Sequence, residues 1–549
     1  MFISIVIFSS LFTASLISFS GFGILLNKNK EDFLLNIIFG YLISSILIVT
    51  IHFFFAINLV VITIIFTIGF FLSIKNYDFS IQRVEKKFYL FFFVFLILIP
   101  IFISQKYHED FGYYHLPHII NLANEKIIFG LGNLNDGFIH NSIWLNVISL
   151  FYIGNNYNFV TLPTFLLYFI FIIYSVNQII NQNKYYSSSY FLIICIFYLI
   201  LKFTRISEFG NDIPSLIYSI LGIFFFLKYE EEDNSLNKKI FFFRHLSFVA
   251  FAVLIKFSVI PIIILTLFIF FRDFKIISRE IFKYNYFIIY FLVIIFFFKQ
   301  FVYTGCFVFP SKITCMNVSW FNNEFLNLSS KLELVNKSYS VARAFISSDE
   351  YLVNFNWVPY WFNRNYPEII EHFLTMLIPI FIFLLLSKNN NNNINNTNNI
   401  NYLKVFVLFL VIGFIFWFTL SPVYRFGILY FLCLIFIFTI PLYKKKIFSK
   451  KIFLTLLCLF LTFNFSKNIS RIIQKNYIAF GIDRVNNQYV LNDNYNNNII
   501  SVFRPNIEAN ELNGNGWQGR LCWDIPFMCS YNKIKVNLIN NYYVISKLN

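Results

Sequence analysis

The hydrophobic positions of this chain form long runs that are separated by polar connections. Runs of about 20 apolar residues begin near positions 3, 33, 57, 88, 160, 187, 213, 285, 371, 402, 424 and 451. A helix of about 20 apolar residues spans the hydrocarbon core of a bilayer. The pattern therefore predicts an all-α polytopic membrane protein.

Two segments fit this pattern only if they do not cross the membrane fully. Residues 247–271 are apolar except around Lys256, Ser258 and Pro261, and we expect a short re-entrant hairpin with these residues at its apex. Residues 142–158 are expected to lie along the membrane surface. About fourteen transmembrane or re-entrant helices result, with both ends of the chain on one side. The first run lacks preceding Lys or Arg and a cleavage site, so we expect it to be retained as a span.

The composition agrees with a membrane protein and explains the aromatic content. Hydrophobic residues make up 58% of the chain and charged residues 13%, and the mean hydropathy is +0.66. The 79 Phe accompany abundant Ile, Asn, Lys and Tyr, as AT-rich codons would supply, so no single Phe points to function. The same bias raises Lys, so the net charge of +16 indicates topology by its position and predicts no nucleic-acid partner.

Basic residues concentrate in five connections, which the positive-inside rule assigns to the cytoplasm. They are Lys28 and Lys30; Lys75, Arg83, Lys86 and Lys87; Lys238, Lys239 and Arg244; Arg272, Lys275, Arg279 and Lys283; and Lys444 to Lys451. The connections 106–159 and 302–370 then lie outside. We expect a transmembrane domain over 1–466, an Asn-rich cytoplasmic linker at 389–401, and a small extracytoplasmic C-terminal domain at 467–549.

The cysteines support this topology. Cys306 and Cys315 share one predicted outer loop, and Cys522 and Cys529 share the predicted outer tail, whereas Cys195, Cys433 and Cys458 lie within spans. Spacings of nine and seven residues suit two local disulfides in an oxidising compartment. A zinc site would need cysteines two to four residues apart with further ligands, so no metal is expected there.

A polar stretch from about residue 106 to 141 holds the first candidate site. Glu109 and Asp110 follow an apolar run, and four of the seven histidines of the chain lie in this stretch. His115, His118 and Asn121 are spaced by three residues, which places them on one face of an expected surface helix. Alternatively, the acidic pair simply begins a solvated loop.

Further polar residues are expected at the same outer face. Glu208 and Asp212 precede the span near 213, where they could bind a metal or acceptor hydroxyls, or cap the helix. Lys256 and Arg425 lie at membrane depth. A cation there pairs with an acid, reaches for the interface, or holds an anionic head group.

Several short motifs resemble a family of bacterial multi-pass membrane proteins of largely unassigned function, which are themselves similar to GT-C type glycosyltransferases. The motifs are Asp110-Phe-Gly-Tyr-Tyr-His115 with GLGNLNDGF and Asn141-Ser-Ile-Trp144; Gly305-Cys-Phe-Val-Phe-Pro310 with Asn317-Val-Ser-Trp320; Pro422-Val-Tyr-Arg425-Phe-Gly427; and Cys522-Trp-Asp-Ile-Pro-Phe-Met-Cys529. They occur in the order of that family and span most of the chain. Several spans precede the first motif here, whereas many such enzymes have one.

The resemblance implies a GT-C-like fold in the bacterial cytoplasmic membrane, with its active face in the cell envelope outside. It implies a polyprenyl-phosphate-linked sugar as donor and a glycan, lipid or protein as acceptor. Asp110, beside Glu109, matches the acidic residue of the first outer loop. As a base it would take the proton of the acceptor hydroxyl, and a single displacement would invert the anomeric configuration.

Lys256 and Arg425 would stabilise the charge that builds on the departing phosphate, and His115, His118, Glu208 and Asp212 would contact substrate. No cofactor is expected, although His115 and His118 with Glu109 or Asp110 also form an acceptable ligand set for a divalent cation. Three other functions remain open: an O-antigen-type ligase or polymerase, a transporter, and an assembly scaffold that uses the loop 302–370 and the tail.

Overall fold

The computed structural model describes residues 2–27, 29–77, 85–104, 110–154, 156–181, 186–204, 206, 210–389, 400–474, 502–503, 522 and 528–548. Two candidate site residues, Glu109 and Glu208, lie outside the described residues. The same holds for most of the Asn-rich linker and most of the tail beyond residue 474.

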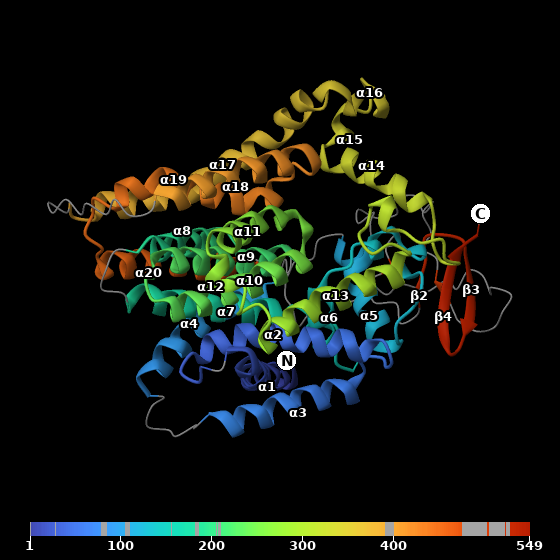
Figure 1. The fold of residues 1–549 in the computed structure, drawn as a ribbon, viewed down its shortest axis with the longest axis horizontal. Helices are drawn as coiled ribbons and strands as arrows, with labels where there is room; N and C mark the ends of the chain where they lie inside the picture. The colour runs from blue at the N-terminus through green and yellow to red at the C-terminus, as the bar shows by residue number, and fades with distance from the viewer. Residues whose placement is uncertain are drawn as a thin grey trace.

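The described chain is mainly helical (Figure 1). Its α-helices are α1 (Phe2–Asn27), α2 (Phe33–His52), α3 (Leu59–Asn76), α4 (Glu85–Ile103), α5 (Leu116–Asn124), α6 (Ile143–Ser149), α7 (Leu162–Ile180), α8 (Ser187–Lys202), α9 (Asp212–Glu231), α10 (Ser235–Ile255), α11 (Ile263–Arg272), α12 (Phe274–Ile277), α13 (Tyr284–Thr304), α14 (Glu324–Asn336), α15 (Tyr339–Ala342), α16 (Ser348–Leu352), α17 (Val358–Leu386), α18 (Ile400–Leu420), α19 (Tyr424–Tyr443) and α20 (Lys450–Ile473). The shorter helical turns are η2 (Phe111–His115), η3 (Leu131–Asn133), η4 (Asp136–Ile139), η6 (Phe257–Ile262), η7 (Lys312–Thr314) and η8 (Val353–Phe355). The strands are β1 (Val502–Phe503), β2 (Met528–Cys529), β3 (Ile534–Ile539) and β4 (Tyr542–Lys547).

Ten of the described helices are long and apolar enough to cross a membrane: α1, α2, α3, α7, α9, α13, α17, α18, α19 and α20. Three shorter apolar helical segments accompany them, Phe91–Ile103, Ser187–Lys202 and Phe257–Arg272. The length and composition of these helices make the chain a multi-pass membrane protein, as the sequence predicts. The total of fourteen crossings or partial crossings stays a prediction.

Most of the long helices run roughly side by side along the long axis of the molecule (Figure 1). α1, α2 and α3 lie at one side, α17, α18 and α19 at the other, and α7 to α11 lie between them. Close helix contact depends on small residues: a Cβ added at Gly40 of α2 would lie 2.0 Å from the carbonyl oxygen of Phe19 in α1. Close approach of this kind is how membrane helices gain packing energy in the absence of a hydrophobic driving force.

The chain reverses direction at Lys256. α10 packs along α9 up to Ile255, and η6 and α11 then lead back to Arg272. Ser258 and Pro261 lie in η6, directly after this turn, and the re-entrant hairpin stays a prediction. The entering helix begins at Ser235, earlier than residue 247, because its first turns carry Lys and Arg that interrupt the hydrophobic run.

Two expectations about the outer segments are wrong. Residues 142–152 do not lie on a surface, because every one of them is buried, and α6 packs against α2 and α5. The helix predicted around His118 is also enclosed, since residues 116–123 of α5 are all buried.

Two predicted boundaries also shift. The span predicted near 371 begins at Val358, within the expected loop 302–370, and α20 continues to Ile473, beyond the expected domain boundary at 466. α17 begins before the hydrophobic run near residue 371. Arg364 and Pro367 interrupt the run of apolar residues, but the helix continues through both of them.

The C-terminal strands pack against the segment 127–134, which follows α5, at the right-hand end of Figure 1. β3 and β4 form an antiparallel hairpin, and Ile545 of β4 donates its backbone N–H to the carbonyl of Phe129. Asn133 donates from its side chain to the carbonyl of Ile545, and a small apolar cluster around Leu134 and Ile534 fills the space between the two segments. The described part of the tail therefore braces the loop that follows Asp110.

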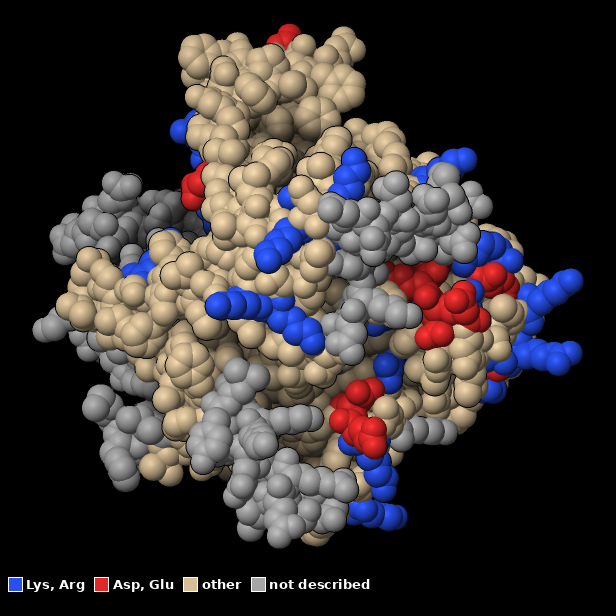
Figure 2. Space-filling view, turned by 90° about the vertical axis from the view of Figure 1, so that its left-hand side faces the viewer, with Lys and Arg blue, Asp and Glu red and all other residues tan. Residues whose placement is uncertain are grey.

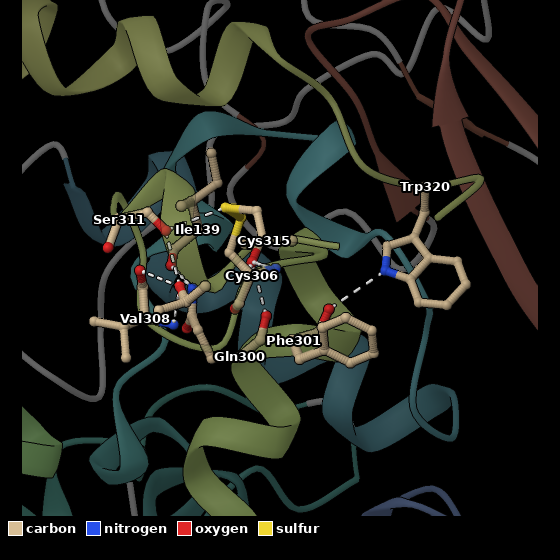
Figure 3. The surroundings of a disulfide bond; sticks show 10 residues. Ile139, Gln300, Phe301, Cys306, Val308, Ser311, Cys315 and Trp320 are labelled. Carbon is tan, nitrogen blue, oxygen red and sulfur yellow. Dashed lines mark hydrogen bonds between the residues drawn. A yellow bond between two sulfur atoms is a disulfide. The ribbon is translucent and has the colours of Figure 1, made fainter. Parts of the chain in front are cut away.

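Both predicted disulfides form, Cys306–Cys315 and Cys522–Cys529. The first lies just beyond the end of α13, where Gly305 ends the helix with φ +83° (Figure 3). Near it, Gln300 donates to the carbonyl of Ile139, one residue before His140. The end of α13 next to this disulfide thus holds the loop on which the candidate site is built.

The disulfides predict a simple count of thiols. In the denatured protein, alkylation without a reductant is expected to modify three cysteines, and alkylation after reduction all seven. Intact-protein mass spectrometry measures both numbers. Five modified cysteines before reduction would show that one pair is not formed.

Candidate active site

Four of the predicted site residues, distant in sequence, meet at one place. Asp110 directly precedes η2, Asp212 is the first residue of α9, Lys256 occupies the turn between α10 and η6, and Arg425 is the second residue of α19. We call these four residues the charge cluster. Helix ends position all of them, so the cluster depends on the arrangement of the whole bundle.

Arg425 lies between the two carboxylates. Its Nη2 is 3.8 Å from Oδ2 of Asp110, and its Nε is 3.5 Å from Oδ2 of Asp212. Lys256 donates to the other oxygen of Asp212, Oδ1. The Nε of Arg425 is buried and faces Asp212 without making a hydrogen bond within the described part of the chain, so its contact with Asp212 is an ion pair only.

The charge cluster is partly open to its surroundings. The exposed fraction of its side chains ranges from 11% for Asp212 to 33% for Asp110. The Nζ of Lys256 lies 3.4 Å from the centroid of the Phe426 ring, which forms an apolar wall. Two positive and two negative charges balance each other, as partly buried charges require. A ligand with an anionic group can therefore enter only by competing with these carboxylates for the cations.

The structure shows what Asp212, Lys256 and Arg425 contact, which the sequence left open. Asn211 occupies the N-cap of α9, and the carboxylate of Asp212 is engaged by Lys256 and Arg425. Asp212 is thus more than a helix cap, although its charge also suits the N-terminal end of the helix dipole. Both cations pair with acids.

Three side chains of residues 110–141 lie near the charge cluster. Burial raises the pKa of Tyr114, and Asp110 raises it further, so the phenol stays protonated near the carboxylates. His140 has an exposed side chain and lies close enough to Asp110 and Lys256 for both charges to act on it. His115 packs against Gly210, where an added Cβ would lie 2.8 Å from its Cε1. Gly210 has φ +50°, a backbone conformation that favours glycine. The absence of a side chain thus permits both this turn and the close contact with the His115 ring.

His118 faces a different part of the protein. Its ring lies 5.6 Å from that of Tyr303 in α13, and it lines a small pocket together with His52 and Asn121. Both of its ring nitrogens are buried and have no hydrogen-bond partner in the described residues. Burial lowers its pKa, and the nearby Lys299 and His115 lower it further. The structure therefore does not bring His118 to the charge cluster.

A family model with the description "Domain of unknown function (DUF8201)" matches residues 1–432. The chain belongs to this family. The matched residues contain all four members of the charge cluster, so the cluster lies within the family's own domain. No curated protein and no solved structure matches the chain.

The candidate cation site is not assembled among the described residues. There, no group of three or more His, Cys, Asp or Glu side chains lies close enough to hold a metal ion. Asp110 faces Arg425, and His118 turns toward α13. Glu109, the remaining member of the expected ligand set, lies outside the described residues.

Sequence reasoning missed three neighbours of the charge cluster, Tyr114, His140 and Phe426. Tyr114 and His140 lie in the polar stretch, but nothing in their spacing distinguishes them from Tyr113 or His108. Phe426 is one of 79 Phe, and only the fold shows that the ammonium group of Lys256 lies over its ring. The motif around Arg425 was the one available signal for it.

The ion pair between Lys256 and Asp212 predicts that removing Lys256 lowers the free energy of unfolding, and that also removing the charge of Asp212 restores part of it. Lys256→Met removes one partner of a largely buried ion pair and is expected to cost about 3 kcal/mol. Adding Asp212→Asn should restore a substantial part of this loss, since no uncompensated carboxylate then remains. The midpoint of thermal unfolding in detergent measures both changes.

Lys202→Met is the matched control, because its partner Glu371 is 68% exposed and such pairs contribute less than about 1 kcal/mol. An equally small effect of both lysine substitutions would contradict the assigned pairing.

Proposed function

We propose that this protein is a membrane glycosyltransferase of GT-C-like architecture. It transfers a sugar from a polyprenyl-phosphate donor to an acceptor at the outer face of the cytoplasmic membrane. The observation that carries the proposal is the convergence of Asp110, Lys256 and Arg425 in one partly open cluster of carboxylates and cations. A donor phosphate needs the cations, and an acceptor hydroxyl needs a base.

Arg425 and Lys256 are the proposed phosphate ligands. Arg425 lies 3.8 Å from Asp110, beyond normal hydrogen-bonding distance, and a phosphate oxygen can replace that contact with a shorter one. The planar guanidinium suits the geometry of phosphate oxygens. Asp212 positions both cations and, as a positioning residue, does not contact the reacting atoms.

Asp110 is the proposed general base. It takes the proton of the acceptor hydroxyl as the acceptor oxygen bonds to the anomeric carbon of the sugar. The bond from that carbon to the phosphate oxygen breaks, and its electron pair leaves with the polyprenyl phosphate. Arg425 and Lys256 stabilise the negative charge that develops there.

A single displacement inverts the anomeric configuration. Retention would need a second carboxylate as nucleophile. Asp212 is near enough to be considered, but one of its oxygens contacts Lys256 and the other Arg425. A carboxylate held by two cations is a poor nucleophile, so we infer inversion.

Two observations support the proposed orientation. The disulfide Cys306–Cys315 and the tail strands lie at the same end of the bundle as the first outer loop. The opposite end, shown in Figure 2, gathers many Lys and Arg side chains and a smaller group of acidic ones. Disulfides form in oxidising compartments and basic loops stay in the cytoplasm, so the charge cluster is proposed to face outward.

The same site would also serve an O-antigen-type ligase or polymerase, whereas a transporter or scaffold would leave the donor intact. To separate them, the purified protein is reconstituted with a panel of labelled polyprenyl-phosphate sugars and an extract of envelope acceptors. We expect one sugar to be added per acceptor and polyprenyl phosphate to be released. Long products would indicate a polymerase, and intact donor in every reaction would contradict the proposed activity.

A further inference from the structure

The segment between α13 and α17 presents apolar side chains where a polar outer loop was expected. We call residues 324–357, which include α14, α15, α16 and η8, the outer arm. Phe345 is 78% exposed and Val335 is 74% exposed, and Val353 and Phe355 are each more than half exposed. Single exposed apolar residues are common on proteins, but several within one short segment indicate a contact surface.

The outer arm is a folded unit, so this exposure is not a consequence of missing structure. Tyr351 and Trp357 are fully buried beneath it, and the hydroxyl of Tyr351 donates to the carbonyl of Lys337. The Trp357 ring packs 4.9 Å from that of Phe418 in α18. The outer arm therefore buries one set of aromatic side chains and leaves Phe345 and Phe355 outside.

The exposed apolar surface continues onto a membrane span. α17 directly follows the outer arm and exposes Phe362, Ile370, Leu374 and Ile378 along its length. At the junction, Trp357, Trp361 and Trp417 pack together inside the protein and join the arm to α17 and α18. In Figure 1 the arm lies at the end of α17 and α18. Lipid that covers α17 thus meets the outer arm.

We infer that the outer arm is embedded in the headgroup region of the membrane, with Phe345 and Phe355 at the boundary of the acyl chains. The occupant of this surface is bilayer lipid. Arg343, Asp349 and Glu350 are exposed on the same arm and remain in water or among head groups. This makes residues 324–357 an interfacial membrane anchor.

The outer arm also supports the turn that carries Arg425. Asn336 of the outer arm donates to the hydroxyl of Ser421, and Trp361 of the adjoining α17 donates to the carbonyl of Pro422. Trp417 donates to the carbonyl of Val423, two residues before Arg425. Asn336 therefore links the outer arm to the turn that precedes Arg425, a link whose bearing on phosphate binding rests on the proposed function.

Spin-label accessibility tests the membrane contact directly. Phe345→Cys is labelled with a nitroxide in a Cys458→Ser background, because Cys458 is the exposed free thiol of the described residues. Asp349→Cys on the same arm is the matched control. In vesicles of phosphatidylethanolamine and phosphatidylglycerol, the label at 345 should collide more with oxygen than with a water-soluble nickel chelate. The label at 349 should show the reverse.

A label at 345 that collides mainly with the nickel chelate would overturn the inference. Protection from both reagents would overturn it as well, since a protein partner or a second copy would then cover the surface. Phe345→Ser with Phe355→Ser should weaken binding of a polyprenyl-phosphate sugar several-fold. The accessibility result does not depend on catalysis, so failure of the proposed function leaves it intact.

Discussion

Asp110→Asn is expected to lower the rate of sugar transfer by about 10²–10⁴-fold, the contribution typical of a general base. The amide keeps the shape of the side chain but cannot accept the proton of the acceptor hydroxyl. Arg425 still pairs with Asp212, so the protein should insert and fold. Initial rates with a labelled polyprenyl-phosphate sugar and the elution profile of the purified variant measure the two effects.

Two matched substitutions accompany this test. Asp136→Asn changes another carboxylate of the same loop, in the first turn of η4, and should leave the rate near that of the wild type. Glu109→Gln should have a smaller effect than Asp110→Asn. Full activity in Asp110→Asn would eliminate Asp110 as the base.

Arg425→Met is expected to reduce kcat/KM by about 10²–10³-fold. This is the typical loss when an enzyme loses one preorganised donor to an anion that develops in the transition state. Lys256→Ala should weaken handling of the same phosphate. Arg425→Lys should fall between Arg425→Met and the wild type, since it keeps the charge but loses the planar fork. Steady-state kinetics over a range of donor concentrations show whether the lost contact acts in binding or in turnover.

Arg364→Met controls for the loss of an arginine near the same end of the bundle, because Arg364 is exposed in the early turns of α17. We expect it to retain wild-type kinetics. If Arg425→Met also retained them, the phosphate would have to bind elsewhere.

Much of the charge cluster was predictable because charged residues are rare in this chain and their positions are constrained. Lys256 interrupts an apolar run, and Arg425 lies at the start of another, so each stood out from its surroundings. A charge at such depth needs a partner, and Asp212 and Asp110 provide partners. The contacts themselves needed the fold, since they join residues as far apart as 110 and 425.

The enclosed outer segments could not be predicted from hydropathy. α6 reads as a moderately apolar stretch that is too short to cross, which fits a surface segment as well as a buried one. Its burial depends on Trp144, which packs near Tyr41 and donates to Thr164 across helices. His118 was misplaced for the same reason, because spacing by three residues says which residues share a helix face but not what that face meets.

A structure of the protein with a bound polyprenyl-phosphate sugar tests the central claim most directly. We predict that the phosphate lies within hydrogen-bonding distance of Arg425 and Lys256, with Asp110 on the acceptor side of the anomeric carbon. A donor bound at another site, with the Arg425–Asp110 and Lys256–Asp212 contacts unchanged, would contradict the assignment of the charge cluster as the active site.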